Sequence, residues 1–130
     1  MRYIFITFTF SLLFLTSPIT AQELGILYLK KVNGKIGWFD SGNAQKNWKY
    51  TGEIFDSKPN GTGVLSSPFE KYSGEFKNGR MHGQVTHTFG NGKKRVGEFR
   101  KGKPWNVKSY DKNGNIEYRW VNGIKHKKEE

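Results

Sequence analysis

The chain has 130 residues, enough for one domain, and carries 22 Lys and Arg residues against 11 Asp and Glu, a formal net charge of +11. It contains no cysteine, which excludes a disulfide framework, cysteine-based metal sites and thiol catalysis. The positive balance favours contact with anionic partners, although lysines spread along a sheet also keep its edges soluble and unpaired.

Residues 1–21 have the pattern of a secretory signal. Arg2 gives a short positive region, Tyr3–Thr16 is apolar, and small residues lead to a cleavage point after Ala21. The apolar run is short for a membrane span, which needs about 20 residues. We therefore expect export to a periplasm or out of the cell, with cleavage after Ala21. If the segment stays uncleaved, it would serve as a membrane anchor.

The rest of the chain contains an internal repeat. Tyr50-Thr-Gly-Glu-Ile aligns with Tyr72-Ser-Gly-Glu-Phe, and this aligns with Arg95-Val-Gly-Glu-Phe. The downstream halves keep step, because Asn60, His82 and Trp105 follow at the same interval. We divide the chain into a signal peptide (1–21), a degenerate N-terminal hairpin (22–49), repeats (50–102), a degenerate C-terminal repeat (103–124) and a charged tail (125–130).

Each repeat alternates with a period of two, which is typical of β-strands. Tyr72, Gly74 and Phe76 fall on one face of the first strand, and a return strand follows the Asn78-Gly79 turn. Asn-Gly and Ser-Gly pairs recur along the chain, as hairpins favour, and helical periodicity is absent after the signal. The pattern predicts an all-β array of tandem hairpins.

Two positions recur inside the first strand of each repeat. We expect a neighbouring aromatic ring to fill the space above the glycines Gly52, Gly74 and Gly97. Aromatic residues of successive units would then form a continuous ladder in place of a compact core. The glutamates Glu53, Glu75 and Glu98 fall on the opposite face beside lysines and arginines, so we interpret them as cross-strand charge partners and not as catalytic acids.

These residues resemble the MORN (membrane occupation and recognition nexus) repeat. The resemblance implies a single-layer, twisted antiparallel sheet that grows by one hairpin per repeat into an elongated, slightly curved plate. It also implies a scaffold or attachment module, often self-associating and linked to membranes, without catalytic residues of its own. The repeat-defining positions are Tyr50, Gly52, Glu53, Tyr72, Gly74, Glu75, Phe76, Gly79, His82, Gly83, Gly97, Glu98 and Phe99.

Three histidines raise the question of chemistry. His82 and His87 lie five residues apart, close enough for a two-histidine metal site or an acid–base pair. His82 occupies the His-Gly position of the repeat, which favours a role in the turn, and His87 replaces an aromatic residue in the ladder. Glu75 and Lys77 should point away from His87. We therefore predict no catalytic residue, no metal site and no cofactor.

Tryptophans and lysines remain as candidate contact residues. Trp120 falls in the repeat register, whereas Trp48 and Trp105 do not, so we expect the latter two to be better placed for a partner. The basic cluster near the C-terminus adds Lys125, Lys127 and Lys128. We expect an exported, non-enzymatic module that binds a protein partner or itself. The alternative is a peripheral binder of anionic lipid or of a cell-envelope polyanion; binding of nucleic acid or of a small-molecule substrate is not expected.

Overall fold

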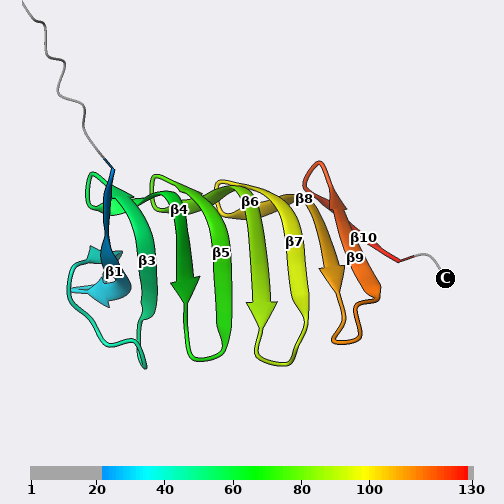
Figure 1. Ribbon diagram of the computed structural model, residues 1–130, viewed down its shortest axis with the longest axis horizontal. Coiled ribbons are helices and arrows are strands. Elements are labelled where there is room, and N and C mark those ends of the chain that lie inside the picture. The colour runs from blue at the N-terminus through cyan, green and yellow to red at the C-terminus, as the bar shows by residue number, and fades with distance from the viewer. Residues whose placement is uncertain (1–21, 129–130) are drawn as a thin grey trace, which may run out of the picture.

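The computed structural model describes residues 22–128, so the predicted signal peptide (1–21) and the final two glutamates lie outside the described residues. Within this range the chain forms one ten-stranded antiparallel sheet and no helix, which confirms the all-β prediction (Figure 1). The strands are β1 (Glu23–Val32), β2 (Lys35–Phe39), β3 (Trp48–Phe55), β4 (Lys58–Ser66), β5 (Glu70–Lys77), β6 (Arg80–Phe89), β7 (Lys94–Arg100), β8 (Lys103–Tyr110), β9 (Ile116–Val121) and β10 (Ile124–Lys127).

The hairpins follow one another along the sheet except at its N-terminal end. From β3 to β10 each strand pairs with its neighbours in sequence, as the repeat predicts. At the N-terminal end the order is β3-β1-β2, so β1 pairs with β3 through Glu23–Leu29 and with β2 through Tyr28–Val32. The two strands of the first hairpin therefore lie in the reverse of the order expected from the sequence, with β2 at the edge of the sheet. Lys125–Lys127, which we expected in a charged tail, lie in the edge strand β10.

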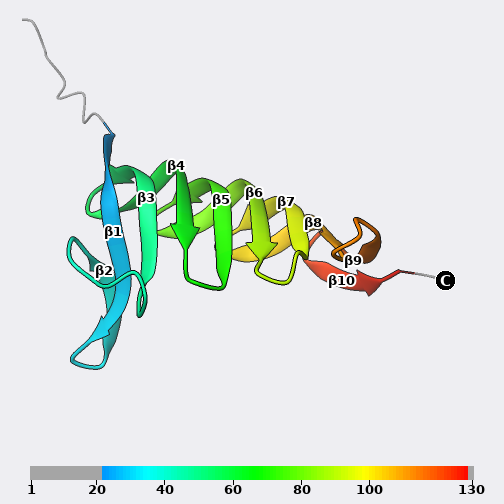
Figure 2. The ribbon, with the colours of Figure 1, turned by 60° about the horizontal axis from the view of Figure 1, so that its bottom comes forward.

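A line of register shifts bends the sheet. In three hairpins the pairing register shifts beside the repeated Gly-Glu pair. Gly52 pairs with Gly63 and Gly74 with Val85, and between these pairs and the short turn the second strand of each hairpin has more residues than the first. Such bulges kink a strand and strengthen its twist. The strands curl near their short turns, and the elongated sheet becomes a trough along this line (Figures 1 and 2).

The recurrent glycines allow close contact between backbones, so our expectation of an aromatic ring above them was wrong. A Cβ at Gly74 would lie 2.1 Å from the carbonyl oxygen of Gln84 on β6, and one at Gly97 would lie 2.2 Å from that of Asn106 on β8. Both glycines have positive φ, 150° and 148°. The space above a glycine is filled by an aromatic ring elsewhere, at Gly63, where the ring of Tyr50 packs.

The enclosed side chains lie along one face of the bent sheet, which we call the core face. Its buried residues are Leu27, Tyr50, Phe76, Val85, Phe99 and Val107. One aromatic row runs from Trp38 through Tyr50 to Phe76, with ring centroids 6.2 and 5.0 Å apart. At the C-terminal end the buried residues are Val85, Phe99 and Val107, with Trp120 packed against them. A thin, repeated core of this kind stabilises each hairpin mainly through its neighbours.

Candidate interaction surface

The short turns form a hydrogen-bonded row along one edge of the sheet. In each repeat one polar side chain accepts a hydrogen bond from a backbone N–H of the following short turn. Asn60 Oδ1 accepts from the N–H of Asn78 (3.3 Å), and His82 Nδ1 accepts from that of Lys101 (3.2 Å). Backbone carbonyls add a second bond, since Pro59 accepts from Gly79 and Met81 from Gly102, each at 2.9 Å. His82 therefore holds the next turn, which matches its interpretation as a turn residue.

In the third repeat the side chain that holds the next turn lies one residue later in the chain than the sequence alignment suggests. Asn106 Oδ1 accepts from the N–H of Asn122 at 2.9 Å, and the Trp105 carbonyl accepts from Gly123 at 2.9 Å. Asn106, and not Trp105, thus makes the hydrogen bond to the next turn that His82 makes in the second repeat. The bulge in β8 contains one residue fewer than those in β4 and β6, so the carbonyl oxygen of the same Asn106 also approaches Gly97, as that of Gln84 approaches Gly74.

Two repeat glutamates bind the backbone and are not cross-strand charge partners as we expected. Glu53 Oε2 accepts from the N–H of Thr62 at 2.5 Å, and Glu75 Oε2 accepts from that of Gln84. These carboxylates satisfy N–H groups that the bulges leave outside the strand ladder. Of the three repeat glutamates, all among the described residues, only Glu98 forms an ion pair, with Arg100 two residues further along β7 at 2.8 Å.

His87 lies in a buried cluster that sequence reasoning anticipated only in part. Its ring is stacked on Tyr72 with a centroid distance of 3.8 Å and contacts Phe89 at 3.9 Å, so it packs as an aromatic residue. Its Nε2 also donates to Glu70 Oε2 at 2.5 Å. Burial lowers the pKa of His87, and the hydrogen bond to Glu70 opposes that effect. Glu70 was missed, although its position two residues before Tyr72 places it on the same face.

The two histidines do not meet in one site. His87 is 2% exposed between strands, whereas His82 lines a surface groove beside the short turns. Glu75 is bound to the backbone of β6, which separates it from His87. Within residues 22–128 no group of three or more His, Asp or Glu side chains is arranged to hold a metal ion. No helix in this part of the chain is long and apolar enough to cross a membrane.

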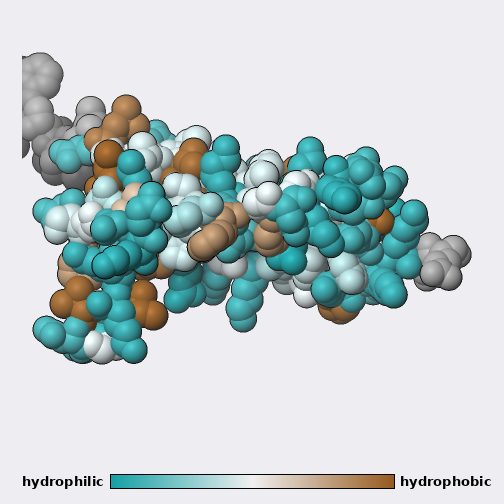
Figure 3. Space-filling view, turned by 90° about the horizontal axis from the view of Figure 1, so that it is seen from below, coloured by the Kyte–Doolittle hydropathy of each residue, from teal (hydrophilic) through white to brown (hydrophobic). Residues whose placement is uncertain are grey.

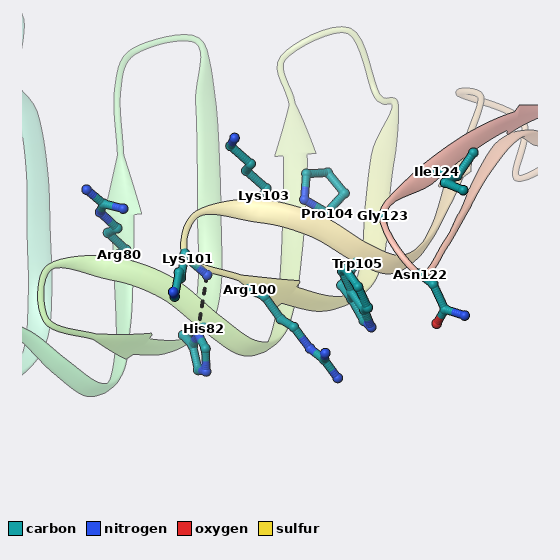
Figure 4. Close-up of a pocket in the computed structure, with 10 residues that line it drawn as sticks. All are labelled: Arg80, His82, Arg100, Lys101, Lys103, Pro104, Trp105, Asn122, Gly123 and Ile124. Atoms are coloured by element: carbon teal, nitrogen blue, oxygen red, sulfur yellow. Dashed lines mark hydrogen bonds between the residues drawn. The ribbon is translucent and has the colours of Figure 1, made fainter.

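The groove beside His82 is strongly basic, and we call it the basic groove. The groove consists of a hollow of about 610 Å³, whose lining is drawn in Figure 4, and an adjoining hollow that shares three of its residues. Its cations come from β6, β7, β8 and their turns, and the sequence alone did not single them out because they are scattered along the chain. The two hollows are lined by Lys77, Asn78, Arg80, His82, Arg100, Lys101, Lys103, Pro104, Trp105, Asn122, Gly123 and Ile124.

The tryptophans pack within the molecule. Trp48 is half-buried against Tyr72, with ring centroids 5.7 Å apart. Trp105 is half-buried in the basic groove, where the Arg100 guanidinium lies 4.3 Å from its ring centroid and Gly123 packs on its six-membered ring. The ring of Trp120 lies between Arg95 and Lys125.

The C-terminal lysines are divided between two faces. Lys125 pairs with Trp120 on β9, and its ammonium lies 4.0 and 5.4 Å from the ring centroids of Tyr118 and Trp120. His126 pairs with Arg119 on the opposite face. Lys128 follows the strand, and its N–H donates to the Glu117 carbonyl at 3.0 Å. A second basic hollow is lined by Arg119, Val121, His126, Lys127 and Lys128.

These features define a repeat protein built from β-hairpins, in which each hairpin carries a Gly-Glu bulge and supports the next turn. The MORN repeat family matches residues 50–68 and 72–94, which are most of β3–β4 and of β5–β6 together with the turn into β7. These hairpins are MORN repeats, and repeats of this family are generally modules that bind proteins or membranes. No curated protein sequence matches the chain.

Proposed function

We propose that the protein is an exported, non-enzymatic scaffold module that binds a protein partner or a second copy of itself. The main support is that the recurring polar side chains are used to hold the array together. Glu53 and Glu75 bind bulge N–H groups, and His82 supports the next turn. What remains for function is a rigid sheet with exposed surfaces, which suits recognition better than chemistry.

The exposed apolar residues support a role in binding. Five of the nine found in residues 22–128 lie on the first hairpin and its neighbour β3, and Figure 3 shows separate apolar groups at this end, whereas the rest of that face is mainly hydrophilic. Leu24 and Val32 lie at opposite ends of β1. Exposed apolar groups often mark an interaction site. The residues concerned are Leu24, Ile26, Val32, Ile36 and Phe55.

Export is tested first, with the full chain expressed in a secreting host. We expect the intact mass of the product to correspond to a chain that begins at Gln22, recovered outside the cytoplasm. A full-length product held in the membrane fraction would support the anchor instead. A full-length product in the cytoplasm would contradict export.

Partner binding is tested by photo-crosslinking on the secreted product in its own envelope or secretome. A crosslinking residue is placed at exposed Leu24 or Ile36, with buried Val107 as the matched control. We expect one discrete adduct from the two exposed positions and none from Val107. Adducts with the chain itself would identify self-association, and the absence of any adduct from the exposed positions would contradict the proposal.

A second candidate function rests on the basic hollow near the C-terminus. Arg119, Lys127 and Lys128 gather there and could bind anionic lipid or a polyanionic glycan. Binding of anionic vesicles or glycans that weakens steeply with salt would support this function. No binding at low salt would rule it out.

A further inference from the structure

The basic groove carries more positive charge than its own residues neutralise. No Asp or Glu is among its lining residues. Among residues 22–128 the ion pairs made by Lys and Arg are Glu117–Lys93 and Glu98–Arg100. The remaining cations of the groove, Lys77, Arg80, Lys101 and Lys103, are exposed and take part in none of these pairs. Four uncompensated cations around two adjacent turns form a strong attraction for anionic oxygens.

His82 adds a directed hydrogen-bond donor. Its Nδ1 accepts the N–H of Lys101, so a neutral ring carries its proton on Nε2. This Nε2–H has no acceptor among the described residues, and His82 lines both hollows. The groove therefore offers a fixed N–H beside mobile ammonium and guanidinium groups, a combination suited to carboxylate or phosphate oxygens.

The spacing of the cations fits an extended chain. Lys77 and Arg80 flank the Asn78-Gly79 turn, and Lys101 and Lys103 flank the turn at Gly102. The two turns are two strand spacings apart, or about 10 Å. Three residues of an extended polypeptide cover about 10 Å as well. Acidic residues at every third position of a partner would thus reach successive turns.

The shape of the groove favours a narrow ligand over a flat surface. Arg80 and Lys103 project to one side of the β8 ribbon, and His82 and Arg100 project to the other (Figure 4). All four line one hollow of about 610 Å³, which a narrow segment can enter and a flat lipid headgroup layer cannot fill. Apolar surface from Pro104, Trp105 and Ile124 lies among the cations and can cover the side chains between the acidic residues.

We propose that the basic groove binds an extended acidic segment of a partner protein, with carboxylate or phosphate groups at every third residue. This inference rests on the proposed scaffold function, and it names the surface and the chemistry of the partner. The oxygens of the segment pair with the cations of successive turns and with His82 Nε2–H, and the residues between them lie over Trp105.

The test uses the secreted chain and fluorescent peptides. One peptide has glutamate at every third residue, a second has the same composition with its glutamates adjacent, and a third has glutamine in place of glutamate. We expect the spaced peptide to bind at least about tenfold more tightly than the glutamine peptide, and to weaken with salt. Replacing the glutamates with phosphoserine distinguishes the two sources of anionic oxygen. Equal binding of the spaced and adjacent peptides would overturn the proposed spacing.

A matched pair of charge reversals locates the site. The double variant Arg80→Glu/Lys103→Glu alters the basic groove, whereas Lys46→Glu/Lys112→Glu changes the net charge equally at exposed positions in the loops 40–47 and 111–115. We expect a loss of at least about tenfold for the first and less than about twofold for the second. Equal losses would show that net charge alone drives binding. Binding of anionic vesicles, but not of the spaced peptide, that depends on Arg80 and Lys103 would assign the groove to a membrane and overturn the proposal.

Crosslinking separates this inference from the proposed function. Suppose that the Arg80→Glu/Lys103→Glu variant still forms the adduct seen with the unaltered chain and binds the spaced peptide as tightly as that chain does. The groove proposal then fails and the scaffold function stands. If no adduct forms with the unaltered chain while the spaced peptide still binds through the groove, the scaffold proposal fails and the groove is confirmed as a peptide site.

Discussion

The carboxylate of Glu75 occupies the space that a side chain at position 83 would need. A Cβ built at Gly83 would lie 2.2 Å from Glu75 Oε2, and the φ of this glycine is 117°. Glu53 stands in the same relation to Gly61, again at 2.2 Å. The glutamate of one strand and the glycine of the next are therefore one structural unit, which explains why both recur in the repeat.

Gly83→Ala should destabilise the fold strongly. Backbone strain and the collision with Glu75 together predict a loss of about 3 kcal/mol in the free energy of unfolding, measured by urea denaturation. Gly102→Ala is the control, because its φ is 79° and nothing lies within 4 Å of the added Cβ; strain alone predicts about 1–2 kcal/mol. In the Glu75→Ala background the cost of Gly83→Ala should fall by about 1 kcal/mol or more. Additive costs would contradict a direct Glu75–Gly83 relationship.

His82→Ala should loosen the β7–β8 turn, because the Lys101 N–H loses its acceptor. We expect a cost of about 1 kcal/mol and faster hydrogen exchange at the Lys101 amide. His82→Asn should restore most of this protection, since asparagine serves the same purpose at Asn60 and Asn106. Unchanged exchange in His82→Ala would show that the bond does not support the turn.

Tyr50→Phe should cost about 1–2 kcal/mol, because the Tyr50 hydroxyl donates to the Glu53 carbonyl at 2.7 Å and this acceptor would lose its partner. Tyr110→Phe should cost less, as its hydroxyl makes no hydrogen bond to the described residues. The comparison is made by urea denaturation at neutral pH. Equal costs for the two variants would contradict the importance of this bond.

The same tyrosine predicts a loss of stability at high pH. Burial, followed by the charge of Glu53, raises the pKa of Tyr50 from 10.0 to about 12. A group whose pKa is raised on folding contributes stability below its unfolded pKa and loses that contribution as the pH rises through the folded value. Stability should therefore fall between about pH 10 and pH 12, and less so in Tyr50→Phe. Tyrosinate absorbance should show tyrosines that ionise late, and Tyr50→Phe should remove one of them but leave Tyr72, whose pKa burial also raises.

His87 predicts an opposite response in mildly acidic solution. Burial lowers its pKa from 6.5, so the unfolded chain takes up the proton first as the pH falls. Its contribution is fully present above about pH 6.5 and is lost from there down to the folded pKa. Thermal unfolding from about pH 7 to pH 5 should show a smaller decline in His87→Phe, which keeps the stacking on Tyr72. The control variant is His126→Gln, on the exposed strand β10. If the decline in thermal stability is unchanged in His87→Phe but disappears in His126→Gln, the assignment to His87 is contradicted.

The hairpin array could be predicted from the sequence because its signals are local. Alternation placed Tyr72 and Phe76 on the core face, and Asn78-Gly79 gave the turn. The His-Gly position correctly identified His82 as a turn residue. Each of these properties depends on a few consecutive residues, and the structure of one strand or turn satisfies it.

The errors concern relations between strands. Gly74 and Gly97 are needed because a bulge in the following strand brings its backbone close to them. Alternation within one strand does not reveal this contact. That Asn106 and not Trp105 supports the next turn depends on the geometry of the bulge in β8, which the alignment of the repeats does not reveal. The order β3-β1-β2 has no local signal, since the Asn33-Gly34 turn is compatible with either order. Extending the pairing of Tyr72 with His87 by one step on the same face places Glu70 opposite Phe89, diagonally next to His87, so this contact could have been anticipated.

The hydrogen bonds between turns give the array a direction. Asn60, His82 and Asn106 each support the turn that comes later in the chain. Removal of the last hairpin, β9–β10, leaves every remaining turn with its support, whereas loss of β3–β4 withdraws support from β5–β6. A chain emerging from the ribosome or a translocation pore therefore completes each hairpin against one that is already in place. Gain or loss of repeats during evolution is least disruptive at the C-terminal end.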